Sequence, residues 1–218
     1  MHSGTGRRHP LLGYLLDAVE GRFPSADGRV TVVPALPGGL EASVAFTGHA
    51  VVATSLAAED VRAQGPDGFG GSLAPGFLRY LAGPGGEIGT LDVTLAARGA
   101  GGPSRLAPLP EGTEHPRIVH ARSLRTHVSL WGDQRGLVTL ADGAAGRREL
   151  SIELWDPAGG PARAGRSLLA DALTLVPFGE PVFAAVSPGN ARSLRAFLAC
   201  GFQPLGSEVL LRPDRPQG

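Results

Sequence analysis

The sequence contains no lysine, and it has only one cysteine, one methionine and one asparagine among its 218 residues. Because all twenty basic residues are arginine, a Schiff-base lysine and a Walker-type phosphate lysine are both excluded. The single cysteine, Cys200, excludes an internal disulfide and a four-cysteine zinc site, and its place at the end of an apolar stretch favours simple packing. No spacing of His, Asp and Glu makes a metal site, and no G-x-S-x-G motif points to a Ser/His/Asp hydrolase.

An excess of charge of either sign is also missing. Twenty Asp and Glu residues balance the twenty arginines, so the whole chain has no electrostatic attraction to nucleic acid or to an anionic membrane. The longest apolar run falls short of a membrane span, and the run from Leu11 to Leu16 is too short for a signal peptide. We therefore expect a cytoplasmic protein with no nucleic-acid and no membrane partner. A homodimer is compatible with the sequence.

Glycine and proline divide the chain into two halves. Residues 99–116, GAGGPSRLAPLPEGTEHP, are dense in both and show no hydrophobic periodicity, so we interpret them as a linker or long surface crossing. This predicts an α/β region over 1–98 and a second domain over 117–218; apolar residues, 42% of the chain, suffice for two small cores. The first half is predicted to form helices over 11–20, from Ser55 and over 74–82, and strands over 29–33, 42–46, 50–54 and 87–97, with a hairpin turn at 47–49.

The second half alternates strands and helices more regularly. The patterns predict strands over 127–131, 137–140, 149–155, 182–186 and 208–211, and helices over 118–124, 166–175 and 191–199. This order predicts an α/β fold class with a mixed, mostly antiparallel central sheet flanked by helices.

The only asparagine, Asn190, follows a Pro-Gly turn in the stretch PVFAAVSPGNARSLRAFLACGF. Asparagine is among the best N-cap residues, because its side-chain oxygen accepts from the free N–H groups of the first helical turn. Gly201 is placed to end the same helix in the left-handed conformation, with Phe202 packing back on the last turn. On this ground alone, Asn190 needs no role beyond that of a cap.

The wider pattern around Asn190 resembles the GNAT acetyltransferase superfamily. A strand, Pro-Gly-Asn, Ser193 three residues on, an apolar helix, Gly201-Phe202 and a closing strand recur together in that family, and the resemblance covers roughly residues 117–213. It implies a GNAT-like acyltransferase fold with acetyl-CoA as cosubstrate, bound by the domain over 117–218, and an acceptor-side role for residues 1–98. It also implies that Asn190 both caps the helix and points toward the pantetheine arm of the cofactor, and that Ser193 is a cofactor-binding residue.

In this family the pyrophosphate of the cofactor binds a glycine-rich loop that opens the preceding helix. The resemblance places the cofactor-binding residues of this loop at Gly160, Arg163, Gly165, Arg166 and Ser167. The leading basic residue of the family pattern is missing, and Arg163 stands where the family has its middle glycine. Helical N–H groups bind phosphate well, and Arg163 and Arg166 can compensate as charged partners. The alternative is an ordinary solvated loop before a helix.

The resemblance also implies how the thioester is placed. In the family, the third strand and the next one splay apart to seat pantetheine, so backbone groups near Leu154 and Trp155 would line the thioester. A tyrosine seven residues after the asparagine often supplies the acid, but here that position is Phe197, which lines the cofactor site without a proton to donate.

Glu153 is the first candidate for the general base, because it lies on the strand that approaches the acceptor, and Glu149 is the second. Strand alternation puts both on one face with Trp155, and desolvation beside a tryptophan raises the pKa of a glutamate. The alternative is that the two glutamates face solvent or pair with Arg147 or Arg148.

These observations predict an acetyl-CoA-dependent N-acetyltransferase that acts on a primary amine of a small molecule or on an amino terminus. The alternative is a non-catalytic GNAT-like protein that binds a ligand or partner through the same groove. Phe197 and the altered loop favour the alternative, whereas the Asn190 motif favours the enzyme.

Overall fold

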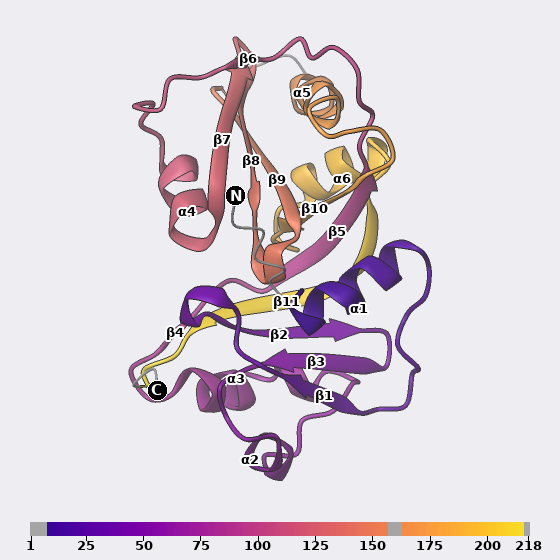
Figure 1. Cartoon of the computed structure of the whole chain (residues 1–218), viewed down its shortest axis with the longest axis vertical. Coiled ribbons are helices and arrows are strands. Elements are labelled where there is room, and N and C mark those ends of the chain that lie inside the picture. The colour runs from indigo at the N-terminus through magenta and orange to yellow at the C-terminus, as the bar shows by residue number, and fades with distance from the viewer. Residues whose placement is uncertain (1–7, 157–162, 216–218) are drawn as a thin grey trace, which may run out of the picture. The chain divides into compact units, whose positions relative to one another are not determined.

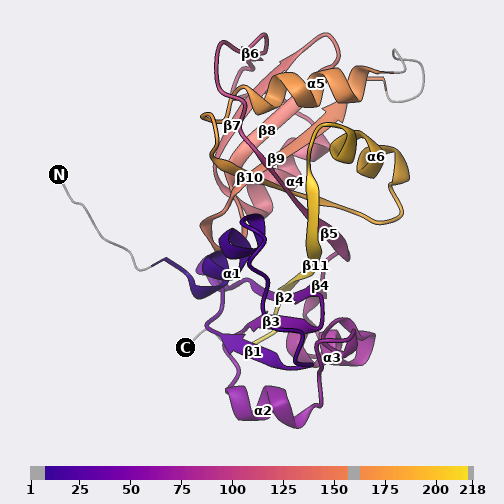
Figure 2. The same ribbon diagram turned by 90° about the vertical axis from the view of Figure 1, so that its right-hand side faces the viewer.

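The computed structural model describes residues 8–156 and 163–215, which fold as two compact units. The first unit consists of Met1–Asp92 and Leu205–Gly218, and the second of Val93–Pro204. Figures 1 and 2 show the helices and strands of each unit under the labels used below. Within the described ranges, no helix combines the length and the apolar character that crossing a membrane requires.

The first unit is built on a sheet in the order β1-β3-β2-β11, with β4 also paired to β11. β1 and β3 are parallel, and the other pairs are antiparallel. The elements are α1 (Pro10–Val19), β1 (Val30–Val33), a 3-10 turn (Pro37–Gly39), β2 (Glu41–Phe46), β3 (His49–Ala53), α2 (Ala58–Ala63), a 3-10 turn (Gly71–Leu73), α3 (Pro75–Ala82), β4 (Glu87–Ile88) and β11 (Gln203–Arg212). The predicted hairpin is confirmed: Phe46 pairs with His49, and Gly48 between them has the positive φ of 71° that such a turn requires.

The core of the first unit lies between the sheet and two helices. Val52 of β3 and Val209 of β11 pack with Val61 of α2 and with Phe77 and Leu81 of α3. The predicted start of α2 was wrong. Ser55 does not cap this helix, because its hydroxyl donates to Oε1 of Glu41 at 3.0 Å, and α2 begins three residues later at Ala58.

A polar cluster anchors α1 to this sheet. His49 Nδ1 lies 2.8 Å from Oδ1 of Asp27, its Nε2 lies 3.0 Å from the hydroxyl of Thr31, and the ring of Tyr14 stacks on the imidazole. Both ring nitrogens therefore have partners, as a buried histidine requires.

The second unit is a sheet in the order β5-β10-β9-β8-β7-β6, in which only the β10–β9 pair is parallel. Its elements are β5 (Asp92–Arg98), β6 (Ala107–Pro108), α4 (Pro116–Leu124), β7 (Thr126–Asp133), β8 (Gly136–Asp142), a 3-10 turn (Ala144–Gly146), β9 (Arg148–Leu154), α5 (Ala164–Leu173), β10 (Pro181–Val186) and α6 (Ala191–Ala199).

Helices cover both faces of the second sheet. Adjacent residues of a strand point to opposite faces. In β8, Leu137 packs with Ile118 of α4, whereas Val138 packs with Leu168 of α5 and Phe197 of α6. The predicted fold class, a mixed and mostly antiparallel sheet flanked by helices, is confirmed.

The division of the chain differs from the predicted boundaries. Most of β5 belongs to the second unit, and residues 205–218 return to the first. The predicted linker over 99–116 is hydrogen-bonded: the N–H groups of residues 99–101 donate to the carbonyls of Glu180, Leu173 and Val176 at 2.8, 2.9 and 3.0 Å. The high content of Gly and Pro here therefore indicates irregular backbone rather than a free linker. The start of this segment is held by hydrogen bonds to the end of α5 and to the residues between α5 and β10.

Candidate functional site

The parallel strands β9 and β10 form a fork. They pair at a single position, Phe183 with Glu149, although β9 runs on to Leu154 and β10 to Val186. On its other edge β9 is paired with β8 over its whole length. The edge of β9 beyond Glu149 therefore carries backbone N–H and C=O groups that β10 does not satisfy, and backbone groups seek hydrogen bonds. A splay at this strand pair is what the GNAT resemblance implied.

Buried charges hold the vertex of the fork. Glu149 Oε1 pairs with Nη2 of Arg125 at 2.6 Å, and its Oε2 accepts from Nε of Arg147 at 3.0 Å. The guanidinium of Arg147 lies 5.7 Å from the centre of the Phe183 ring, a cation–π distance that ties β9 to β10 at their one paired position. A side chain at Gly143 would collide with the Glu149 carboxylate, since an added Cβ would lie against its Oε2.

The carboxyl group of Glu149 has a lowered pKa. Its burial acts to raise the pKa, but the charges of Arg147 and Arg125 and their hydrogen bonds outweigh this effect. The pKa of Glu149 is therefore not raised, as desolvation alone would predict. The sequence pattern could not show that Arg125 pairs with the other carboxylate oxygen. Glu149 is nearly inaccessible and pairs with Arg147, which is one of the alternatives to a role as general base. It is not among the residues that line the cavity described next.

A cavity of about 630 Å³ opens beside the end of β9, between that strand and the helices around it. Ile152, Glu153 and Leu154 of β9 line it together with Arg117 of α4. Its other walls are the start of α5 and one face of α6, two helices that lie next to each other in Figure 2. From the predicted set the cavity brings together Glu153, Leu154, Gly165, Arg166, Asn190, Ser193 and Phe197.

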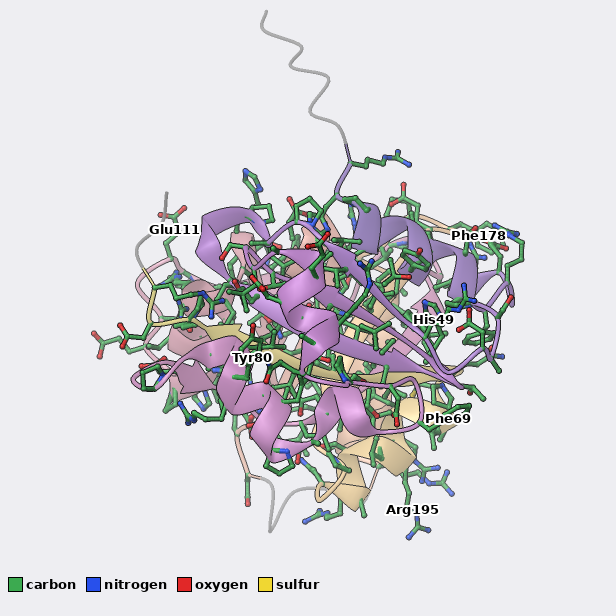
Figure 3. All side chains as sticks on the ribbon, turned by 90° about the horizontal axis from the view of Figure 1, so that it is seen from below. His49, Phe69, Tyr80, Glu111, Phe178 and Arg195 are labelled. Atoms are coloured by element: carbon green, nitrogen blue, oxygen red, sulfur yellow. The ribbon has the colours of Figure 1, made fainter. Side chains whose placement is uncertain are left out.

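Arginine dominates the charge of the cavity. Four arginines line it, against the two carboxylates of Glu153 and Asp156. Three of the four, Arg166, Arg192 and Arg195, form no ion pair with any residue in 8–156 or 163–215. Figure 3 shows Arg195 extending away from the α6 ribbon. Such an uncompensated positive cluster favours an anionic ligand with several acceptor oxygens.

The first turn of α5 adds backbone donors to these charges. The N-cap residue Arg163 makes no side-chain cap bond, and the first N–H groups of a helix, here including that of Gly165, have no partner within the helix itself. Ser167 does not line the cavity, and its hydroxyl donates to the carbonyl of Ala164 at 3.0 Å. Arg163 is exposed and does not line the cavity. The predicted Gly160 lies outside the described part of the chain.

Asn190 caps α6 as predicted. Its Oδ1 accepts from the N–H of Ser193 at 3.0 Å, and both residues line the cavity. Phe197, on the same helix, is buried edge-to-face against Phe202 with ring centres 4.8 Å apart. The position that carries the family's tyrosine thus holds a hydrocarbon ring packed into the core.

Glu153 and Arg117 form an ion pair within the cavity. Oε2 of Glu153 accepts from Nε of Arg117 at 3.1 Å and from Nη2 at 2.9 Å, and about a third of each side chain is exposed, 32% and 36%. Trp155, two residues further, is held elsewhere: its Nε1 donates to the carbonyl of Asp133 at 2.8 Å, and its ring lies edge-on to His115.

Among the cavity residues that the sequence analysis missed are three of its four arginines, Arg117, Arg192 and Arg195. The sequence did contain a signal for Arg192 and Arg195. They lie three residues apart in the helix that Asn190 caps, so they share a helix face close to that cap. Arg117 had no such signal, since only the folded chain brings it to Glu153. Among the described residues, no histidine lines the cavity, and no cluster of His, Cys, Asp and Glu could hold a metal ion.

The two glutamates should differ sharply in their contribution to stability. We expect Glu149→Gln to lower the free energy of unfolding by about 3–5 kcal/mol, because it leaves two buried arginines without their counter-charge. We expect Glu153→Gln to lower it by only about 0–1 kcal/mol, because that pair is partly solvated. Urea denaturation of both variants measures this difference. Equal losses would contradict the assignment of Glu149 to the vertex of the fork.

No protein-family model matches the sequence, and no curated protein matches it either. Solved structures that resemble it include a protein named as an acetyltransferase of the GNAT family from Novosphingobium aromaticivorans, with 18% identity, a TM-score of 0.39, and coverage of 61% of this chain and 69% of that one. A conserved protein of unknown function from Staphylococcus epidermidis has 10% identity and a TM-score of 0.36, covering 63% and 66%. A GCN5-related N-acetyltransferase from Kribbella flavida has 13% identity and a TM-score of 0.36, covering 65% of each chain.

This chain thus spans about two thirds of the length of each of these structures. Two of the three names agree with the resemblance seen in the sequence. TM-scores below 0.5 carry no argument about function, however, so the proposal below depends on the fork, the cavity and their charges.

Proposed function

We propose that the second unit binds acetyl-CoA in the cavity at the β9–β10 fork and transfers its acetyl group to a primary amine, on a small molecule or on an amino terminus. The observation that carries the proposal is the fork itself. It leaves one edge of β9 open to a cavity whose far wall is the start of α5 beside three arginines that have no ion-pair partner in the described part of the chain.

The residues present fit such a ligand. A volume of about 630 Å³ lies within the usual range of about 300–1,000 Å³ for ligand pockets. The open edge of β9 can pair with the amide groups of the pantetheine arm in the manner of an added strand. The α5 N-terminus with Arg166, Arg192 and Arg195 offers N–H donors and positive charge to the phosphates.

Acetyl-CoA would supply an acyl carbon activated as a thioester, whose bond to sulfur breaks as the bond to the acceptor nitrogen forms. The chain must then deliver a neutral amine, because an ammonium has no lone pair for attack. Glu153 is the cavity carboxylate on the strand that approaches the acceptor, so it takes the ammonium proton on its oxygen. Arg117 holds that carboxylate in place.

The proton for the leaving thiol has a different source from the family's usual one. Phe197 carries no hydroxyl and is packed against Phe202, so the proton must come from water or from another residue. The same observation favours the second candidate function, a GNAT-like protein that binds the ligand without turning it over. Binding and turnover therefore need separate tests.

Binding is tested with the two arginines of α6. Each hydrogen bond to a charged group contributes about 1.5–3 kcal/mol, so we expect Arg192→Gln/Arg195→Gln to weaken the affinity for CoA at least about tenfold. The loss should shrink as salt concentration rises. The matched control is Arg105→Gln/Arg122→Gln, which removes the same charge from exposed positions of the same unit outside the cavity.

Isothermal titration with CoA measures all three proteins. Equal affinities of the two double variants would remove Arg192 and Arg195 from the phosphate site. Absence of any binding by the unmodified protein at millimolar CoA would overturn the proposed function.

Turnover is tested by the pH dependence of Glu153→Gln. A general base contributes about a hundredfold to ten-thousandfold, so the variant should be slower by that order near neutral pH. The deficit should shrink as pH rises, because more of the acceptor amine is already neutral. Thiol release from acetyl-CoA across amine acceptors gives the rates, with exposed Glu114→Gln as the control. Parallel pH–rate profiles for the variant and the unmodified protein would exclude Glu153 as the base, and CoA binding without turnover would favour the second candidate.

A further inference from the structure

The Arg117–Glu153 pair presents one unused donor and one unused acceptor to the cavity. Both arginine bonds, from Nε and Nη2, converge on the same oxygen, Oε2. Across residues 8–156 and 163–215, no other side chain or backbone group bonds Nη1 of Arg117 or Oε1 of Glu153. The pair is a cavity wall that offers a positive and a negative group side by side.

From this pair we propose that the acceptor is an α-amino acid or a ligand with the same zwitterionic end. Its ammonium would bind Oε1 of Glu153, and its carboxylate would bind Nη1 of Arg117. The inference deepens the function proposed above and depends on it, because it names the acceptor class of the same cavity.

The open nitrogen and the open oxygen belong to two paired side chains, and the two charges of such a ligand are likewise close together. In an α-amino acid the ammonium and the carboxylate are attached to the same carbon, so one ligand reaches both partners without spanning the cavity. Each contact is a charge-assisted hydrogen bond, the stronger class. The Arg117–Glu153 pair stays intact, since the ligand uses only the two atoms that the pair leaves open.

The surrounding charges favour a carboxylate on the acceptor. Arg125 lies behind this wall on the same side of the sheet as α4, at the end of that helix. The pKa of His120 on α4 is lowered, first by its partial burial and then by the charges of Arg125 and Arg117. A ligand carboxylate would bind Arg117 on the edge of the guanidinium that Glu153 does not use.

The same charges disfavour other amines. A polyamine would bring further cations into a cavity with four arginines and two carboxylates, so each additional ammonium meets net repulsion. A simple monoamine gains the contact with Glu153 but offers no acceptor to Nη1 of Arg117. The property to measure is therefore the preference for amines that carry a carboxylate over amines that do not.

The test compares each of the common L-amino acids with its methyl ester, which keeps the amine and side chain but removes the negative charge. Binding to the full chain is measured calorimetrically with CoA at saturation. We expect at least one amino acid to bind about tenfold or more tightly than its ester, the equivalent of about 1.4 kcal/mol. Arg117→Gln should abolish this preference, and Arg117→Lys, which keeps the charge, should restore part of it.

Arg122→Gln is the matched control, because Arg122 is an exposed arginine of the same helix that does not line the cavity. It should keep the full preference for the acid. If CoA binds but esters bind as well as acids, or no amino acid binds at millimolar concentration, this inference is overturned while the proposed function stands. If CoA itself does not bind, the proposed function fails, and this inference fails with it. A preference that survives Arg117→Gln would assign the carboxylate to another group and overturn the role of Arg117.

Discussion

The fork between β9 and β10 depends on the buried carboxylate of Glu149. Two arginines hold this carboxylate, and one of them lies over Phe183, the residue of β10 that pairs with Glu149. The two strands are therefore pinned at that position and separate beyond it. A buried carboxylate between two arginines is costly to disturb from either side, because removal of one partner leaves an unpaired buried charge. These contacts hold the two strands together at this position, and beyond it β9 and β10 are not paired.

The separation produces both halves of the candidate site. On one side of the sheet, the open edge of β9 faces the α5 N-terminus and the arginines of α6, which suits a long anionic ligand. On the other, Glu153 meets Arg117 from α4, which suits a small polar acceptor. The two carboxylates of β9 thus divide their roles: Glu149 stabilises the fork, and Glu153 faces the cavity. Solvation distinguishes them, since one is buried between arginines and the other is about one third exposed.

Much of the fold was readable from local patterns. Helix α6 was predicted over its observed range, because Asn190 and Gly201 are strong signals at either end. Most strands of both halves were found from their apolar residues, and the Thr-Gly hairpin from its turn chemistry. The single strand predicted over 87–97 was wrong, because the structure has two strands there, β4 and β5, and β6 lies within the predicted linker. The start of α2 was misplaced because Ser55 had a competing partner, Glu41, fourteen residues away. Local propensity gives no information about such a partner.

The site was predictable only in part, for the same reason. The cofactor-side residues Asn190, Ser193 and Arg166 follow a local motif, and the structure brings them to one cavity. Arg117 and Arg125 reach their glutamates across 36 and 24 residues of sequence, respectively, and no spacing rule connects them. The return of residues 205–218 to the first unit is likewise a consequence of pairing between β11 and β2, which lie far apart in the chain.

Amide hydrogen exchange with and without CoA tests the central claim, that the fork is the binding site, most directly. The account predicts slower exchange on CoA addition at the open edge of β9 beyond Glu149 and in the first turn of α5, with β2 and β3 of the first unit unchanged. Tight CoA binding that leaves the amides of residues 150–154 and 164–166 unaffected would contradict it.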